Sequence, residues 1–148
     1  MFKVLVTLLL LNFSAYSIAS PYKLSDSEYF KTIEVGYLLE SRDGIKLFIN
    51  VGIKKLVSAT NSWTALIIFE GEGDHNFPLQ IAKVITPLEQ NLVVYTPHLF
   101  SIKNNQQYKV RVLAYENLTG KVLISEHEQL LYISAEDKVL NKFGINAL

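Results

Sequence analysis

Residues 45–53 read Ile-Lys-Leu-Phe-Ile-Asn-Val-Gly-Ile, and this stretch decides the fold class. Its apolar residues fall at every second position, the period of a strand that buries one face and leaves the other wetter. The turn signal Ser-Arg-Asp-Gly at 41–44 separates it from residues 29–40, which are rich in aromatic and β-branched side chains. These two stretches therefore predict a β-hairpin.

The next segments also predict strands. Residues 63–69 form a continuous apolar run, and its length and β-branching favour a strand buried on both faces. Residues 77–85 and 92–95 are bounded by prolines, which cannot donate to a central ladder, so we expect edge or connecting strands there.

A second hairpin is predicted near the end of the chain. In residues 108–115, the side chains of Tyr108, Val110, Val112 and Ala114 alternate with those of Lys109, Arg111, Leu113 and Tyr115. Residues 116–120 then reverse the chain into 122–124. The polar residues 125–129 predict a bulge or break before the following apolar segment. About seven short strands, with no helix-length segment between them, predict an all-β antiparallel sandwich.

The first 19 residues resemble a signal peptide. Lys3 precedes the short apolar run Val4–Leu11, and small residues at Ser17 and Ala19 suit cleavage after Ala19. The run is shorter than the roughly 20 apolar residues that a membrane-spanning helix needs. We therefore expect an exported protein, periplasmic or extracellular, with no membrane span.

The mature chain is expected to contain one sandwich at 20–133 and a short helical extension at 134–148. Ser134 and Asp137 resemble a capping box, and apolar residues follow at helical spacing before Gly144. We expect this helix to pack on the sandwich, the alternative being an amphipathic helix that binds a partner.

Composition excludes several functional classes. The 148 residues contain 14 basic and 14 acidic side chains, so the chain lacks the positive surplus expected of a nucleic-acid binder. It contains no cysteine, which excludes disulfide scaffolds, thiolate zinc sites and cysteine nucleophiles. Removal of residues 1–19 takes away Lys3 and no acidic residue, leaving a slightly negative mature chain.

Residues 102–115, Ile-Lys-Asn-Asn-Gln-Gln-Tyr-Lys-Val-Arg-Val-Leu-Ala-Tyr, resemble the E–F corner and F strand of fibronectin type III and related immunoglobulin-like domains. The resemblance extends mainly over residues 92–125 and implies an immunoglobulin-like sandwich. It implies that Tyr108 packs at the corner and that its hydroxyl bonds back to the upstream backbone. It also implies that Val110, Val112 and Ala114 face the core, but it does not imply an activity.

The densest polar cluster, residues 70–76, supplies the candidate binding residues Glu70, Glu72, Asp74 and His75. An extended segment would direct its three carboxylates to one side, and carboxylate oxygens suit a cation such as calcium. Glycine-spaced acids are also ordinary turn chemistry, so a solvated loop is the preferred interpretation and no metal site is assigned.

The histidines give no clear catalytic or metal signature. His75, His98 and His127 share no ligand spacing, which weighs against a three-histidine zinc site. In an extended segment, His127 would face away from its neighbours Glu126 and Glu128. Asn117 begins a glycosylation sequon in a predicted turn, relevant only in a eukaryotic secretory pathway.

These observations predict a non-enzymatic exported module without a cofactor that recognises a protein partner through a sheet edge or its end loops. Residues 35–39 are one such edge, because unpaired amides and carbonyls there could receive a partner strand. The alternative is a small-molecule or lipid carrier with an internal apolar cavity. A third hypothesis is a cation-dependent enzyme that uses the loop at 70–76.

Overall fold

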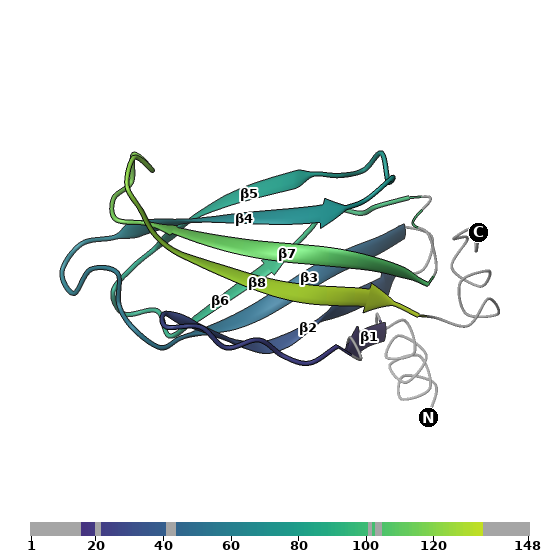
Figure 1. Ribbon diagram of the computed structural model, residues 1–148, viewed down its shortest axis with the longest axis horizontal. Coiled ribbons are helices and arrows are strands. Elements are labelled where there is room, and N and C mark those ends of the chain that lie inside the picture. Colours follow the sequence, from purple (N-terminus) through teal and green to yellow (C-terminus); the bar gives the residue numbers. More distant parts are fainter. Residues whose placement is uncertain (1–15, 20–21, 41–43, 101, 103–104, 135–148) are drawn as a thin grey trace, which may run out of the picture.

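The computed structural model describes residues 16–19, 22–40, 44–100, 102 and 105–134 (Figure 1). These residues form two four-stranded antiparallel sheets that lie one over the other, so the all-β prediction is confirmed. One sheet has the order β1-β2-β3-β6, and the other has the order β5-β4-β7-β8. The strands are β1 (Tyr16–Ala19), β2 (Phe30–Glu40), β3 (Gly44–Ile53), β4 (Trp63–Gly71), β5 (Leu79–Ile85), β6 (Asn91–Tyr95), β7 (Gln106–Tyr115) and β8 (Leu123–Ile133).

The hairpin predicted from residues 45–53 is formed by β2 and β3. They pair along nearly their full lengths, from Phe30 opposite Ile53 to Glu40 opposite Gly44. Gly44 has a φ of +82°, and a Cβ there would lie 2.5 Å from the carbonyl oxygen of Leu99, so both the backbone and the available space favour glycine.

The predicted edge positions are also confirmed, whereas the predicted burial of residues 63–69 on both faces is met only in part. β4 lies between β5 and β7, and its core-facing residues Trp63, Ala65, Ile67 and Phe69 are buried, while Thr64 and Leu66 on the other face are only partly buried. β5 and β6 are edge strands of opposite sheets, as their flanking prolines indicated.

The predicted break at residues 125–129 is wrong, because β8 runs without interruption through this segment. Ala114 pairs with Ser125 and Tyr115 pairs with Leu123, so the register shifts at Ile124, just before the polar run. The polar residues alternate across the strand: His127 and Gln129 face inward, while Glu126 and Glu128 are exposed. The sequence prediction considered only that the segment is polar, and it therefore missed the alternation of buried and exposed residues.

Inward-facing side chains of both sheets form one hydrophobic core. Trp63 begins β4 in this core, with its ring centroid 6.0 Å from that of Phe30. The largest fully buried side chains are Trp63, Tyr37, Tyr108, Phe30, Phe69, Leu39, Ile45, Leu47, Ile49, Ile67, Ile85 and Leu92. The apolar positions at 45, 47, 49 and 51 are all among the core residues, as their alternation predicted.

Two predicted segments lie mostly outside the described residues. Apart from Ser134, the predicted C-terminal helix falls there, as do residues 1–15 of the predicted signal peptide. Residues 16–19 of that peptide are described and form β1 on the outer side of β2. Within the described segments, no helix is long and apolar enough to cross a membrane.

Candidate functional site

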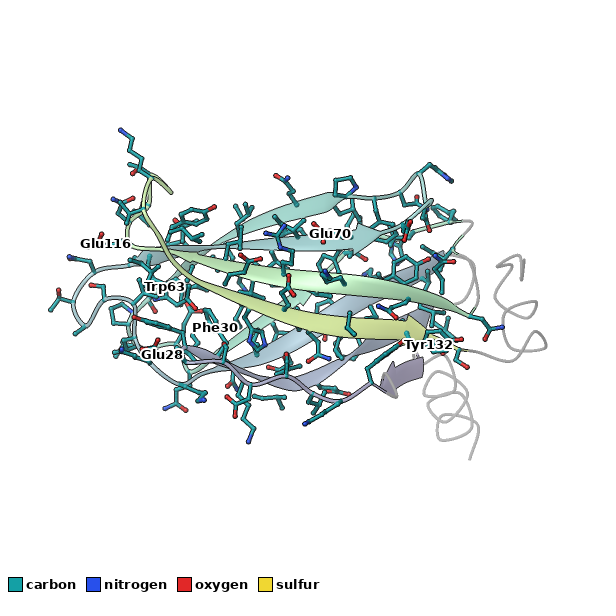
Figure 2. The ribbon with its side chains drawn as sticks, in the orientation of Figure 1. Glu28, Phe30, Trp63, Glu70, Glu116 and Tyr132 are labelled. Carbon is teal, nitrogen blue, oxygen red and sulfur yellow. The ribbon has the colours of Figure 1, made fainter. Side chains whose placement is uncertain are left out.

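The acidic loop after β4 does not gather its carboxylates in one place. Glu70 lies near the end of β4 (Figure 2), where it accepts a hydrogen bond from Arg111 at 3.2 Å. Glu72 is exposed in the turn, and Asp74 is buried with 6% of its surface accessible. His75 is exposed. The three carboxylates do not point to one side, as they would in an extended segment, because the chain turns at Glu72 and Gly73; this agrees with the preferred interpretation of the segment as a loop.

Asp74 connects this loop to the core tyrosine Tyr108. Its carboxylate accepts hydrogen bonds from the Tyr108 hydroxyl at 3.1 Å and from the backbone and side-chain amides of Asn76, both at 2.9 Å. A buried carboxylate requires such donors. Asp74 therefore anchors the loop to β7, a structural role that accounts for its burial.

Tyr108 packs in the core as the family resemblance implied, and Val110, Val112 and Ala114 are buried with it. The Tyr108 hydroxyl donates a hydrogen bond to the side chain of Asp74, in the loop between β4 and β5. The resemblance implied instead an acceptor in the backbone shortly before Tyr108. Gly71 makes this packing possible, since a Cβ there would lie 2.6 Å from the Tyr108 ring.

Arg111 organises the charges on the outer face of the β4-β7-β8 sheet. It donates to Glu126 at 2.7 Å and to Glu70 at 3.2 Å, and Glu128 lies 3.9 Å away. The hydrogen bonds that Arg111 donates to Glu126 and to Glu70, the larger effect first, raise the pKa of its guanidinium. This is a cross-strand ion-pair network in which each carboxylate already has a cationic neighbour.

A second polar cluster, which we call the histidine cluster, was not identified from the sequence. It lies between the segment preceding β2, the start of β2, and the inner face of β8. His127 is at its centre, with 2% of its surface exposed. The cluster consists of Ser25, Ser27, Thr32, His127 and Gln129.

Three hydroxyl groups surround the imidazole ring of His127. Nδ1 lies 2.8 Å from the Ser27 hydroxyl, and Nε2 lies 2.8 Å from the Thr32 hydroxyl and 3.0 Å from the Ser25 hydroxyl. A hydroxyl can donate or accept, so both nitrogens of a neutral imidazole have a hydrogen-bond partner in this cluster.

Burial lowers the pKa of His127, because removing the imidazolium from water disfavours the charged form. Two charged groups act more weakly and in opposite directions: Asp26 raises this pKa and Lys54 lowers it. The cluster therefore holds a neutral histidine that fastens the segment before β2 to β8.

The histidine cluster has few features of a catalytic site. The hydroxyls of Ser25 and Ser27 already donate to Gln129 and to the Phe30 carbonyl, and His127 is closed off from solvent. A histidine general base needs a proton donor that substrate can reach. Across the described part of the chain, no three His, Asp or Glu side chains are grouped closely enough to hold a metal ion.

The sheet edges differ in how they are covered. At one side of the molecule, Lys83 of β5 donates to the Val93 carbonyl of β6 at 3.1 Å, linking the two edge strands. At the other side, the segment 22–29 runs beside β2 and β8 (Figure 1). Its residues Lys23 and Ser25 exchange hydrogen bonds with the Gln129 side chain.

The end loops present one exposed turn of interest. Asn117 lies in the β7–β8 turn, where its side-chain oxygen accepts from the Thr119 backbone amide at 3.1 Å, and Gly120 closes the turn with a φ of +66°. The sequon is therefore surface-exposed, as the glycosylation prediction requires. This turn and residues 61–62 border an open hollow on the surface.

Comparison of the chain with protein families, with curated proteins and with solved structures returned no match. The functional argument therefore depends on the geometry of the loops, the histidine cluster and the sheet edges.

Proposed function

We propose that this protein is an exported, non-enzymatic binding or assembly module, periplasmic or extracellular, that recognises a protein partner by strand addition at a sheet edge. The observation that carries the proposal is the pairing of β2 with β1. Gly36–Leu39 of β2 receive a four-residue antiparallel strand. An edge that accepts one short strand has the backbone geometry to accept another.

We also propose that the fold is immunoglobulin-like, of the fibronectin type III kind. The strand order supports this: β2, β3 and β6 would correspond to A, B and E, and β5, β4, β7 and β8 to C′, C, F and G. The placement of Tyr108 near the start of β7 gives further support, because the family places its corner tyrosine there. Many binding and assembly proteins use this architecture, which is compatible with the proposed role.

The carrier hypothesis has less support. Side chains from both sheets meet in one packed cluster, with large aromatic and aliphatic groups filling the interface. A carrier would instead need apolar walls around a space of several hundred cubic ångströms.

The hypothesis of a cation-dependent enzyme that uses the loop at 70–76 has less support for a different reason. Asp74 is occupied by Tyr108 and Asn76, and Glu70 by Arg111, which leaves Glu72 and His75 as the exposed polar groups of the loop. Replacing Glu72 alone with alanine is the cleaner test of this hypothesis, because Asp74 has a structural role.

Two measurements test export and partner binding. Intact mass of the protein from the exported fraction should show a chain that begins at Ser20, and the full-length mass would contradict export with cleavage. Affinity capture with mild amine crosslinking should recover a stoichiometric partner linked through Lys31 or Lys46, which belong to β2 and β3. Crosslinks through Lys83, on the opposite side at β5, serve as the internal comparison, and repeated recovery of the bait alone would contradict the assembly role.

A further inference from the structure

The N-terminal chain covers the outer edge of β2 in two separate parts. Near the start of β2, the Thr32 amide donates to the Ser25 carbonyl at 3.0 Å and the Ser27 amide donates to the Phe30 carbonyl at 2.8 Å. Near its end, Gly36–Leu39 pair with β1 in the antiparallel register Ala19–Gly36 to Tyr16–Leu39. The edge is thus divided between the segment 22–29 and β1.

The segment 22–29 is attached to both sheets without the help of β1. Ser25 donates to Gln129 of β8 through its backbone amide at 2.7 Å and through its hydroxyl at 2.8 Å. His127 holds Ser25 and Ser27 in the histidine cluster. Lys54, beyond β3, pairs with Asp26 and donates to the Ser27 carbonyl at 2.8 Å.

Tyr22 extends this attachment to within three residues of β1. Its hydroxyl donates to the side-chain oxygen of Gln107 at 2.8 Å, and its ring meets that of Tyr132 edge-on at 5.7 Å. The chain from Tyr22 onward is therefore anchored to β7 and β8. Strand β1, in contrast, pairs with β2.

The predicted cleavage site falls between these two parts, because Ala19 is both the last residue of β1 and the last residue of the predicted signal peptide. We propose that cleavage converts this edge into a strand acceptor: it removes β1 from Gly36–Leu39, leaves the segment 22–29 in place, and lets an extended strand of another polypeptide take the register of β1. This proposal rests on the proposed export and binding function, and it names the surface and its regulation.

The exposed edge also sets the chemistry of the strand that fits it. Tyr37 and Leu39 face the core, with 1% and 0% of their surfaces exposed, and they lie at the end of the sandwich where β1 pairs. Residues directly opposite each other in antiparallel strands share a face. The partner strand should therefore carry apolar residues opposite Tyr37 and Leu39. The strand seated there now has Ile18 and Tyr16 at those register positions.

Backbone hydrogen bonding adds two further requirements. The partner segment should be extended over about four residues, and it should have no proline where the ladder needs an amide donor. Because the proposed function is recognition of a protein partner, we infer that the occupant is an exposed segment of a different exported protein, with alternating apolar and polar residues.

A binding experiment with a synthetic peptide of residues 15–21 tests this inference. The peptide is titrated into the mature chain from the exported fraction and into the uncleaved full chain, with fluorescence anisotropy as the readout. We expect saturable binding to the mature chain and at least about tenfold weaker binding to the full chain, because its tethered β1 competes at an effective concentration near the millimolar range. A peptide with Ile18→Pro is the matched control and should not bind.

A locked full chain provides a second, independent measurement. The protein has no cysteine, so Ser17→Cys with Leu38→Cys, at directly opposite positions, introduces one cross-strand disulfide. The oxidised chain should show no peptide binding, and reduction should restore the weak binding of the full chain.

The outcomes separate this inference from the proposed function. Equal peptide affinity for the mature and full chains would overturn the inference. A captured partner that protects the β5 or β6 edge would also overturn it while leaving the binding function intact. Dimerisation of the mature chain through Gly36–Leu39 would replace the foreign strand with a second copy and so contradict the stated occupant. If neither peptide nor native partner binds any edge, both proposals fail.

Discussion

Substitution of His127 by glutamine should remove most of the loss of stability that occurs between about pH 7.5 and 5.5. Because burial lowers the pKa of His127, the folded protein binds fewer protons at this site than the unfolded chain does. The contribution of the buried neutral imidazole to the free energy of unfolding is therefore present in full above the unfolded pKa of about 6.5, and it is lost as the pH falls below that value. Between about pH 7.5 and 5.5 the loss reaches up to about 1.4 kcal/mol if the folded histidine stays neutral throughout.

Chemical denaturation at the two pH values measures this loss directly. The wild-type protein should lose up to about 1.4 kcal/mol of unfolding free energy between them in excess of the loss seen for His127→Gln, a difference of about 5 °C in melting temperature. His75→Gln, at an exposed position of the β4–β5 loop, is the matched control and should keep the wild-type pH dependence. Equal pH dependence for wild type and His127→Gln would refute the assignment of a buried neutral imidazole.

Three further substitutions test the packing of the sheets. Tyr108→Phe removes the hydroxyl that donates to buried Asp74 and should cost about 1–2 kcal/mol in urea unfolding, whereas no loss would mean that this bond is absent in solution. Gly71→Ala places a methyl group against the Tyr108 ring and should cost about 1–3 kcal/mol, and an unchanged melting temperature would contradict the close approach. Arg111→Ala should change stability by no more than about 1 kcal/mol, since its pairs with Glu70 and Glu126 lie on the outer face, and a loss above about 2 kcal/mol would contradict that estimate.

Alternation explains why the sheets could be predicted from the sequence. The apolar positions at 45, 47, 49 and 51, and the pattern at 108–114, point to one face, and the structure buries that face. Gly44 and Gly120 marked the hairpin turns, and both have positive φ. The period of two and the turn residues are local properties, so a single sequence displays them.

The histidine cluster could not be predicted because its partners are distant in the chain. Ser25 and Ser27 lie about a hundred residues before His127, and only the return of β8 beside the start of β2 brings them together. A signal was nevertheless present: His127 and Gln129 alternate with two glutamates, the pattern of a continuous strand with polar residues on its inner face. The sequence prediction overlooked this pattern because it interpreted the polar residues as a break in the strand.

The acidic loop shows the same dependence on distant residues. Its composition left a cation site open beside the preferred solvated loop, and the position of each carboxylate depends on residues elsewhere: Glu70 meets Arg111, and Asp74 meets Tyr108. The pairing of β1 with β2 was equally inaccessible, because cleavage-site residues do not reveal that they also form a strand.

Hydrogen exchange at the Gly36–Leu39 amides tests the strand-acceptor account most directly. The amides of this segment that point toward β1 should exchange slowly in the full chain, faster in the mature chain, and slowly again when the peptide of residues 15–21 is bound. The alternate amides of the segment point toward β3, and they should stay protected in all three states, as should the Thr32 amide, which is bonded to Ser25. Equal exchange of the β1-facing amides in all three states would contradict the claim that cleavage opens this edge to a partner strand.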